Sequence, residues 1–291
     1  MIENKPILLT GAHRTGTTWL ANMLALSKGM QIASEPFNLM GWAYKLDGLV
    51  DNWFTYVPAL PEEKVINAYR KVMDCKTGRI YGRKKIQRYF PFTRKGRLII
   101  KDPIACMSSD WLANKFELDV LVTIRHPAAF ALSLKRMNWS FDFNHLLRQE
   151  KLVDDYLSLF IKEMEAQPSE VVEQAALVWK IIYHVLSQYI YKNPEWIMVK
   201  HEDISRKPIE ELRVLYDRLG LIWSNKIEMQ VKQYTGKGNP VNPKQGVAHQ
   251  MVRDSKKNID RWKKLLSKDE VYTVKRVTAG VAEKYYCEAD W

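Results

Sequence analysis

The sequence predicts an α/β fold in which a central parallel β-sheet is flanked by helices. Short, continuous apolar runs, typical of strands buried on both faces, alternate with segments that have the apolar spacing of helices. Such alternation is typical of strand–helix–strand units, which build parallel sheets covered on both faces. We expect strands at 6–10, 30–33, 97–101, 120–124 and 196–200, and helices at 17–26, 109–115, 127–137 and 208–219.

Further helices are expected to cap or flank this sheet. Segments 61–73, 144–165 and, most clearly, 170–191 look helical, and the last of them places its apolar residues on one face. The glycines and prolines between 235 and 255 predict a long loop. No linker rich in Gly, Ser or Pro divides the 291 residues, so we expect one domain, 1–291.

The composition, with 46% hydrophobic and 27% charged residues, is that of an ordinary globular protein. No apolar stretch approaches the roughly 18 residues of a membrane span, and the N-terminal segment has no basic leader, so we expect a cytoplasmic protein. Cys75, Cys106 and Cys287 lie far apart in the sequence. This predicts neither a disulfide framework nor a zinc site, and no bound metal is expected.

The chain is basic, with 45 Lys and Arg against 33 Asp and Glu and a net charge of +12. Such a charge favours the capture of polyanions, and nucleic acid, a phosphorylated cofactor and an acidic substrate all satisfy it. Segment 76–97 alone holds nine Lys or Arg and no Asp or Glu. Taken by itself, this run is typical of a solvated basic loop.

The stretch Gly11-Ala-His-Arg-Thr-Gly-Thr-Thr-Trp19 has the spacing of a phosphate-binding loop between a strand and a helix. Its glycines allow several backbone N–H groups to converge on an anion, and the start of the helix adds positive potential. Thr17 stands where a Walker A loop carries lysine, and Arg14 supplies a cation from within the loop. The expected fold is therefore a P-loop-containing three-layer α/β fold. A kinase that uses MgATP stays open, because Asp102 directly follows a strand.

The pattern R-[ST]-G-T-T-W from Arg14 to Trp19 resembles the 5′-phosphosulfate-binding loop of the sulfotransferases that use 3′-phosphoadenosine 5′-phosphosulfate (PAPS). A second similarity is Arg125 with Ser133 eight residues later, which resembles that family's 3′-phosphate site. Segment 199–208 is similar to a structural segment of the family, and 253–266 resembles its basic segment over the nucleotide. The resemblance implies cofactor contacts from Arg14, Thr15, Gly16, Thr17, Thr18, Trp19, Arg125, Ser133, Arg253, Lys256 and Lys257.

The resemblance also implies the catalytic groups. Arg14 is the cation for the leaving group, and Lys101, at the end of a strand on the same sheet edge, is placed to assist it. Where cytosolic members carry K-T-H-x-P, this chain has Lys101-Asp-Pro103, which is similar to carbohydrate-type members with a Glu-Pro dipeptide. Glu35 of Ser34-Glu35-Pro36 is thus the expected base, with Asp102 as the fallback and His13 in a positional role.

The sequence therefore predicts an enzyme that moves a sulfuryl group from PAPS to a hydroxyl acceptor, with an amine as the second choice. Two alternatives stay open: a P-loop kinase, and a basic nucleic-acid-binding protein with Tyr81, Tyr89 and Phe90 inside its basic run. On the main interpretation no nucleic-acid partner is expected. The acceptor is expected to be acidic, in contact with 76–97, or a carbohydrate. A cluster of Trp42, Tyr44, Trp53 and Tyr56 is a candidate wall of its pocket.

Overall fold

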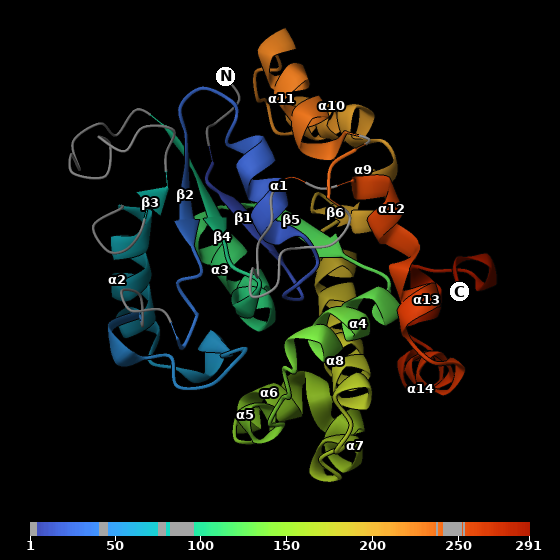
Figure 1. Cartoon of the computed structure of the whole chain (residues 1–291). Helices are drawn as coiled ribbons and strands as arrows, with labels where there is room; N and C mark the ends of the chain where they lie inside the picture. Colours follow the sequence, from blue (N-terminus) through green and yellow to red (C-terminus); the bar gives the residue numbers. More distant parts are fainter. Residues whose placement is uncertain are drawn as a thin grey trace.

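A computed structural model describes residues 5–40, 46–74, 80–81, 96–236, 238–240, 252 and 254–291. Its centre is a β-sheet with the strand order β3-β2-β4-β1-β5-β6 (Figure 1). The strands are β1 (Ile7–Gly11), β2 (Met30–Ser34), β3 (Ile80–Tyr81), β4 (Arg97–Lys101), β5 (Asp119–Ile124) and β6 (Ile197–Lys200). All of them are parallel to their neighbours except β3, which pairs antiparallel with β2 at the edge. The expected parallel sheet is confirmed, whereas the short edge strand β3 was not predicted.

Alternate residues of β1 point into two separate cores, as the period of two in a strand requires. Leu8 packs with Ile100, Val122 and Trp179 in one cluster, while its neighbours Ile7 and Leu9 belong to the other. Strand β1 pairs with β4 and β5, so both of its edges are also covered. The strand is buried along its whole length, which is why its sequence is a continuous apolar run.

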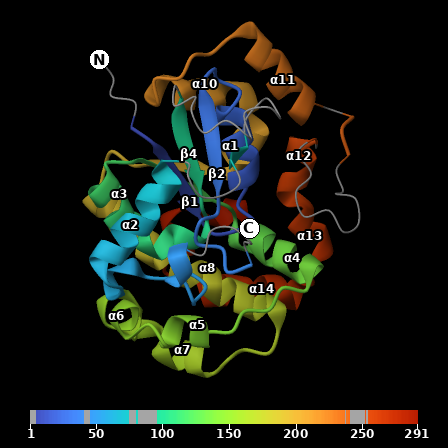
Figure 2. The ribbon, with the colours of Figure 1, turned by 90° about the vertical axis from the view of Figure 1, so that its left-hand side faces the viewer.

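Helices cover both faces of the sheet and give the three-layer fold (Figures 1 and 2). One face carries α1 (Thr17–Leu24) and α10 (Pro208–Arg218), whose Leu20 and Tyr216 belong to the core with Leu9. The other face carries α2 (Glu62–Met73), α3 (Ser109–Phe116), α4 (Pro127–Met137) and the long helix α8 (Val171–Lys192). Further α-helices in the C-terminal third are α9 (His201–Arg206), α11 (Asn225–Thr235), α12 (Ser255–Asn258), α13 (Trp262–Leu265) and α14 (Lys268–Thr278).

The expected helix over 144–165 is broken into short pieces. These are α5 (Asn144–Leu147), α6 (Glu150–Leu152), a π-helical turn (Val153–Leu157), a 3₁₀ turn (Ser158–Phe160) and α7 (Ile161–Glu165). The first break lies at Gln149, whose side chain forms hydrogen bonds to two backbone groups. It accepts from the backbone N–H of Tyr56 at 2.7 Å and donates to the carbonyl of His145. A long-range contact has therefore replaced a regular helix here.

Short 3₁₀ turns complete the described chain, at Leu46–Gly48, Val57–Ala59, Ile104–Ser108, Ile259–Arg261, Ala282–Lys284 and Glu288–Asp290. Most of the loop expected at 235–255 lies outside the described residues. Among the helices that are described, none has the length and apolarity needed to cross a membrane.

Candidate active site

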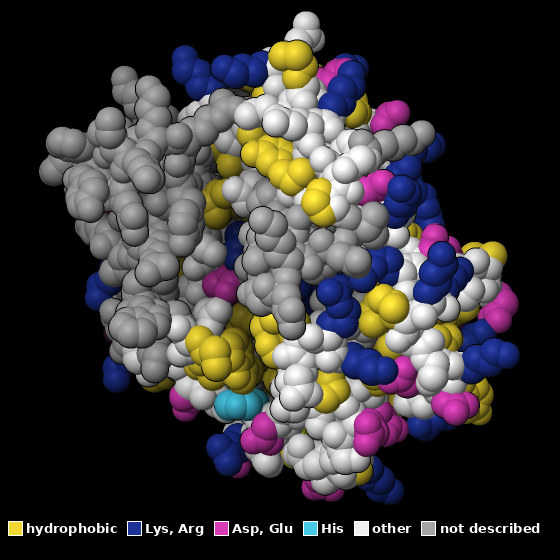
Figure 3. All heavy atoms as spheres, in the orientation of Figure 1, with side chains coloured by type: hydrophobic (Ala, Val, Ile, Leu, Met, Phe, Trp, Pro, Cys, Tyr) yellow, Lys and Arg dark blue, Asp and Glu magenta, His cyan; other side chains and the backbone are white. Residues whose placement is uncertain are grey.

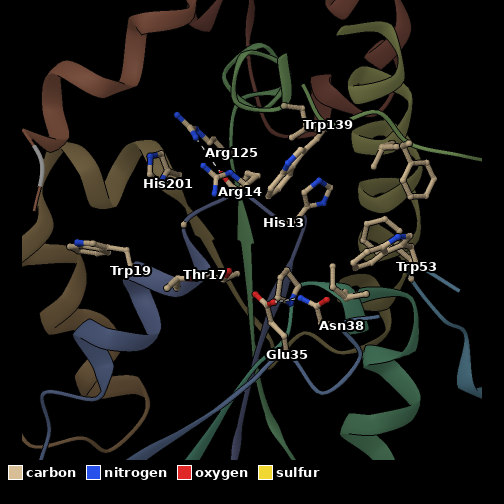
Figure 4. Close-up of a pocket in the computed structure, with 18 of the residues that line it drawn as sticks. His13, Arg14, Thr17, Trp19, Glu35, Asn38, Trp53, Arg125, Trp139 and His201 are labelled. Atoms are coloured by element: carbon tan, nitrogen blue, oxygen red, sulfur yellow. Dashed lines mark hydrogen bonds between the residues drawn. The ribbon is translucent and has the colours of Figure 1, made fainter. Parts of the chain in front are cut away.

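A cavity of about 570 Å³ opens at the carboxyl ends of the parallel strands, the edge at which open α/β sheets bind ligands. The segments that follow the strands meet there: His13 and Arg14 after β1, Glu35 after β2, Arg125 after β5 and His201 after β6 (Figure 4). The cavity is completed by α1, by the end of α4 and by α12. Residues more than 200 positions apart in the sequence, such as Arg14 and Ser255, therefore line one space.

The loop after β1 is held in the shape of an anion cradle. Gly11 and Gly16 have φ angles of 124° and 99°, in the region that glycine tolerates best, and Arg14 lies between them at φ 65°. The hydroxyl of Thr15 donates to the carbonyl of Ala12 at 2.6 Å and lies 2.7 Å from Thr123 Oγ1. Thr15 thus ties the loop to β5 from behind. The N-terminal end of α1, at Thr17, is left facing the cavity.

Arg14, Arg125 and Ser133 form one group beside this loop. Arg14 Nε donates to Ser133 Oγ at 3.1 Å, and Arg125 donates from its guanidinium to the carbonyl of Arg14 at 3.3 Å. Ser133 lies in the second turn of α4, which Pro127 begins directly after Arg125. Two cations and a hydroxyl at the end of a strand can bind a phosphate by charge and by hydrogen bonds.

Hydrogen bonds from α8 and α9 hold the backbone at Arg125 and His126 in place. Trp179 Nε1 donates to its carbonyl at 2.9 Å, and the buried carboxylate of Glu202 accepts from the next backbone N–H, of His126, at 3.0 Å. Tyr286 donates its hydroxyl to the same carboxylate at 3.1 Å. Burial lowers the pKa of Arg125 to about 10, so the guanidinium stays charged at neutral pH, and its Nε has no partner among the described residues. An enclosed, charged donor without a partner fits an anionic ligand.

Glu35 and Lys101 lie side by side at the ends of β2 and β4. Lys101 Nζ forms an ion pair with one carboxylate oxygen of Glu35, and Asn38 Nδ2 donates to the other at 2.6 Å. The backbone N–H of Glu35 also donates to the carbonyl of Lys101 at 2.8 Å. Glu35 has a φ of 54°, a conformation that a residue other than glycine rarely adopts. These contacts hold its carboxylate at the cavity wall.

Asp102, the fallback base, does not line the cavity. Its carboxylate accepts from three backbone N–H groups, those of Phe37 at 2.7 Å, Ile104 at 2.9 Å and Ala105 at 3.2 Å. Complete burial raises its pKa to about 7. Asp102 therefore fixes the turn that carries Glu35, and its contacts are structural.

The sequence profile of the sulfotransferase family matches residues 6–225, which is most of the chain. The chain belongs to the sulfotransferase family. Curated proteins give no match. Among solved structures, the sulfotransferase domain of the Synechococcus PCC 7002 olefin synthase is 14% identical, with a TM-score of 0.49, and covers 95% of this chain and 96% of that one.

Two more solved structures have similar scores. The sulfotransferase domain of the curacin biosynthetic pathway is 15% identical, with a TM-score of 0.47 and coverage of 94% of this chain and 96% of that one. Mouse sulfotransferase SULT7A1, complexed with PAP, is 12% identical, with a TM-score of 0.47 and coverage of 99% and 87%.

The sulfotransferase has functional candidates that sequence reasoning missed. His201 and Ser205, in a segment read as structural, line the cavity from α9. A Cβ added to Gly16 would lie 2.9 Å from His201 Nδ1, so the loop and α9 are in close approach. His201 directly follows β6, and this position at the end of a parallel strand was the available signal.

The other predicted residues are distributed as follows. Gly16, Thr17, Thr18 and Trp19 line the cavity, whereas Thr15 lies behind the loop. On α12 the lining residues are Ser255 and Asn258, while Lys256 and Lys257 are exposed. Trp53 lines the cavity, and Tyr56 is buried beside Asp155. Arg253, Trp42, Tyr44 and segment 76–95 lie outside the described residues.

His13, expected to be positional, forms part of the cavity wall. Its ring lies against Phe54, Phe130 and Trp139, with centroids 5.8, 5.2 and 6.3 Å away. Burial and the nearby Arg14 lower its pKa to about 4, so the imidazole is neutral at neutral pH. Across the described part of the chain, no three His, Cys, Asp or Glu side chains are grouped as a metal site would require.

Proposed function

We propose that this sulfotransferase moves a sulfuryl group from PAPS to a hydroxyl acceptor, by in-line transfer without a metal ion. The observation that carries the proposal is the contact of Arg14 with Ser133, which joins the phosphate loop to α4 at one end of the cavity. The two anionic groups of PAPS require two such sites within the length of one nucleotide. The unpartnered Nε of Arg125 and the positive φ angles of Gly11 and Gly16, which shape the loop as a cradle, support this fit.

The nucleotide is held by two sets of groups. Arg125 and Ser133 bind the 3′-phosphate, and the loop from Arg14 to Trp19 binds the 5′-phosphosulfate through its backbone N–H groups and the start of α1. Trp19 and His201 lie on the same side of the cavity and flank the nucleotide (Figure 4). Lys256 and Lys257 add positive charge from α12, on the side where Lys and Arg side chains gather on the face seen in Figure 3. Arg253, outside the described residues, is a further candidate from the sequence.

The reaction needs a proton acceptor and a cation. When bound, PAPS supplies the sulfuryl group: the acceptor oxygen bonds to sulfur while the bond from sulfur to the 5′-phosphate oxygen breaks, which gives a sulfate ester and 3′,5′-ADP. Glu35 takes the acceptor proton on its carboxylate. Lys101 and Asn38 hold that carboxylate in place. Arg14 neutralises the charge that develops on the leaving oxygen.

Calorimetric titration with 3′,5′-ADP, with and without Mg²⁺, tests the nucleotide site. We expect metal-independent binding that Arg125→Ala weakens by roughly 10–100-fold, because hydrogen bonds to a charged group are worth about 1.5–3 kcal/mol. The matched control is Arg218→Ala, an exposed arginine on α10 that is not part of the cavity wall. MgATP is titrated in parallel.

Preferential binding of MgATP, or 3′,5′-ADP binding that survives Arg125→Ala unchanged, would contradict the proposal. A kinase predicts the first result. A nucleic-acid-binding protein predicts affinity for polynucleotides with a steep salt dependence and no need for Arg125.

A further inference from the structure

The cavity has a second half, which the proposed nucleotide contacts do not use. Figure 4 shows Trp19 and His201 on one side, His13 and Trp53 on the other, and Arg14, Thr17 and Glu35 between them. If the nucleotide occupies the first side, as proposed above, the acceptor must lie on the second, with its hydroxyl toward Glu35. The inference below rests on that proposed function.

Aromatic rings form the wall of this acceptor half. His13 contacts Phe54 with centroids 5.8 Å apart, and Phe54 contacts Phe141 at 5.6 Å. Trp139 extends the wall from His13 to Arg14, whose guanidinium lies 5.5 Å from the Trp139 ring centre. Trp53 and Asn38 lie on this side as well (Figure 4). The cavity is also lined by Met40, Pro103, Ile104, Leu134, Asn138 and Ser140.

Charge is distributed unevenly between the two halves. The guanidinium groups of Arg14 and Arg125 lie toward the nucleotide side (Figure 4). In the acceptor half, Glu35 is the one described lining residue with a charge, and it is paired with Lys101. The His13 imidazole is neutral because its pKa is lowered to about 4. Among the described lining residues, an anionic acceptor would thus meet a carboxylate and aromatic rings, and Arg14, the cation beside Trp139, is assigned to the nucleotide.

A polyhydroxylated acceptor fits this half equally poorly. Each sugar hydroxyl buried against Phe54, Ile104 or Leu134 would lose hydrogen bonds to water without gaining a partner, at a cost of about 1–3 kcal/mol. An apolar ring system in the same place gains contact area with the aromatic wall.

We infer that the acceptor is a neutral alcohol with an apolar, ring-bearing body. Its hydroxyl faces Glu35, and its body lies against Trp53, Phe54, Trp139 and Phe141. The aromatic wall binds the apolar body of the substrate, whereas Glu35 accepts the proton of its hydroxyl.

Three acceptors with the same primary hydroxyl group test this inference: 3-phenylpropanol, 4-(3-hydroxypropyl)benzoate and methyl α-D-glucopyranoside. Their binding to the complex of the enzyme with 3′,5′-ADP is followed by tryptophan fluorescence, and sulfuryl transfer is followed with labelled PAPS. We expect 3-phenylpropanol to bind at least about tenfold more tightly than either polar analogue, the factor that 1.4 kcal/mol provides.

Variants of Trp53 test whether the aromatic wall contacts the acceptor. Trp53→Ala should weaken 3-phenylpropanol binding by about tenfold or more while 3′,5′-ADP binding is unchanged. Trp53→Arg places a cation in the wall and should raise the relative affinity for the benzoate. Trp111→Ala is the matched control, because Trp111 packs on α3 against Phe116 and is not part of the cavity wall.

The outcomes separate this inference from the proposed function. Absence of 3′,5′-ADP binding overturns the sulfonucleotide site itself. Normal 3′,5′-ADP binding with preference for the glucoside or the benzoate, or with no saturable binding of 3-phenylpropanol at millimolar concentration, overturns the acceptor class alone. So does a Trp53→Ala variant that behaves like Trp111→Ala.

Discussion

The Nε atom of Arg14 donates a hydrogen bond to Oγ of Ser133 at 3.1 Å, across 119 positions of sequence. The contact couples the phosphate loop to α4 before any ligand is bound, so the two proposed phosphate sites are positioned relative to each other.

Ser133→Ala should weaken 3′,5′-ADP binding by roughly 3–10-fold, because one hydrogen bond contributes about 0.5–1.5 kcal/mol. Titration calorimetry measures the effect. Ser187→Ala, which removes a hydroxyl that bonds the carbonyl of His184 on α8, is the control and should bind normally. Equal affinity of the two variants would mean that Ser133 holds Arg14 without contributing to the nucleotide site.

Gly16 is expected to tolerate no side chain. Its φ of 99° strains any other residue, and a Cβ would lie 2.9 Å from His201 Nδ1. Gly16→Ala should therefore reduce 3′,5′-ADP affinity by at least about tenfold, since a shift of the loop displaces the N–H groups that face the anion.

The double variant Gly16→Ala/His201→Ala separates the two causes. Removal of the imidazole relieves the close contact, while the backbone strain stays, so affinity should recover in part relative to Gly16→Ala, after correction for His201→Ala alone. Full recovery would show that the positive φ at position 16 adds no backbone strain when alanine replaces glycine. No recovery would show that the approach of α9 is irrelevant.

The sequence was most informative where burial dictated the residue type. Strands such as β1 are covered on both faces, so their apolar runs, and the polar residues directly after them, could be recognised. Arg14 and Arg125 follow such strands, and Ser133 follows on the next helix at a fixed spacing. The strand pattern located these positions at one edge of the sheet, and the family resemblance assigned them to the proposed nucleotide site.

Other features depend on long-range contacts that a local pattern does not encode. The break in 144–165 arises where Gln149 bonds the backbone of Tyr56, and β3 is only two residues long and pairs at an edge. The aromatic wall joins Phe54 and Phe141 from distant segments, and no spacing predicts that contact. Helix α14 was also missed, although its Ser267–Glu270 capping box is a visible start signal.

Glu35→Gln tests the proposed base. The amide cannot accept the acceptor proton, so kcat should fall by about 10²–10⁴-fold while 3′,5′-ADP affinity is retained. Glu163→Gln is a matched control, because Glu163 is likewise paired with a lysine, Lys180, at 3.0 Å, but outside the cavity. Unchanged turnover of Glu35→Gln would exclude Glu35 as the base.

Lys101→Met tests whether the ion pair positions Glu35. Without the cation the carboxylate of Glu35 loses one of the groups that hold it in place, so kcat should fall while 3′,5′-ADP affinity is retained. Unchanged turnover of Lys101→Met would contradict a positioning role.

The stability of the protein should depend on pH through His126. This side chain is buried, with its ring stacked on Trp262 at 4.7 Å and its Nδ1 accepting from the backbone N–H of Ala128 at 3.3 Å. Burial lowers its pKa from 6.5 to about 3. Between these values the unfolded chain binds a proton that the folded protein does not. The free energy of unfolding therefore rises with pH between about pH 3 and 6.5, and the contribution of His126 is lost as the pH falls through this range.

His126→Asn keeps an acceptor for the Ala128 N–H but removes the titration. Urea unfolding of wild type and variant between about pH 4.5 and 6 should show a slope smaller by about 1.4 kcal/mol per pH unit in the variant. His13, whose pKa is also lowered, to about 4, contributes equally to both proteins and cancels in the comparison. Loss of the stacked ring should lower the variant's stability at every pH, so the slope is the quantity that decides. Parallel slopes would mean that His126 charges without unfolding, which requires the C-terminal segment around Trp262 and Trp291 to open first.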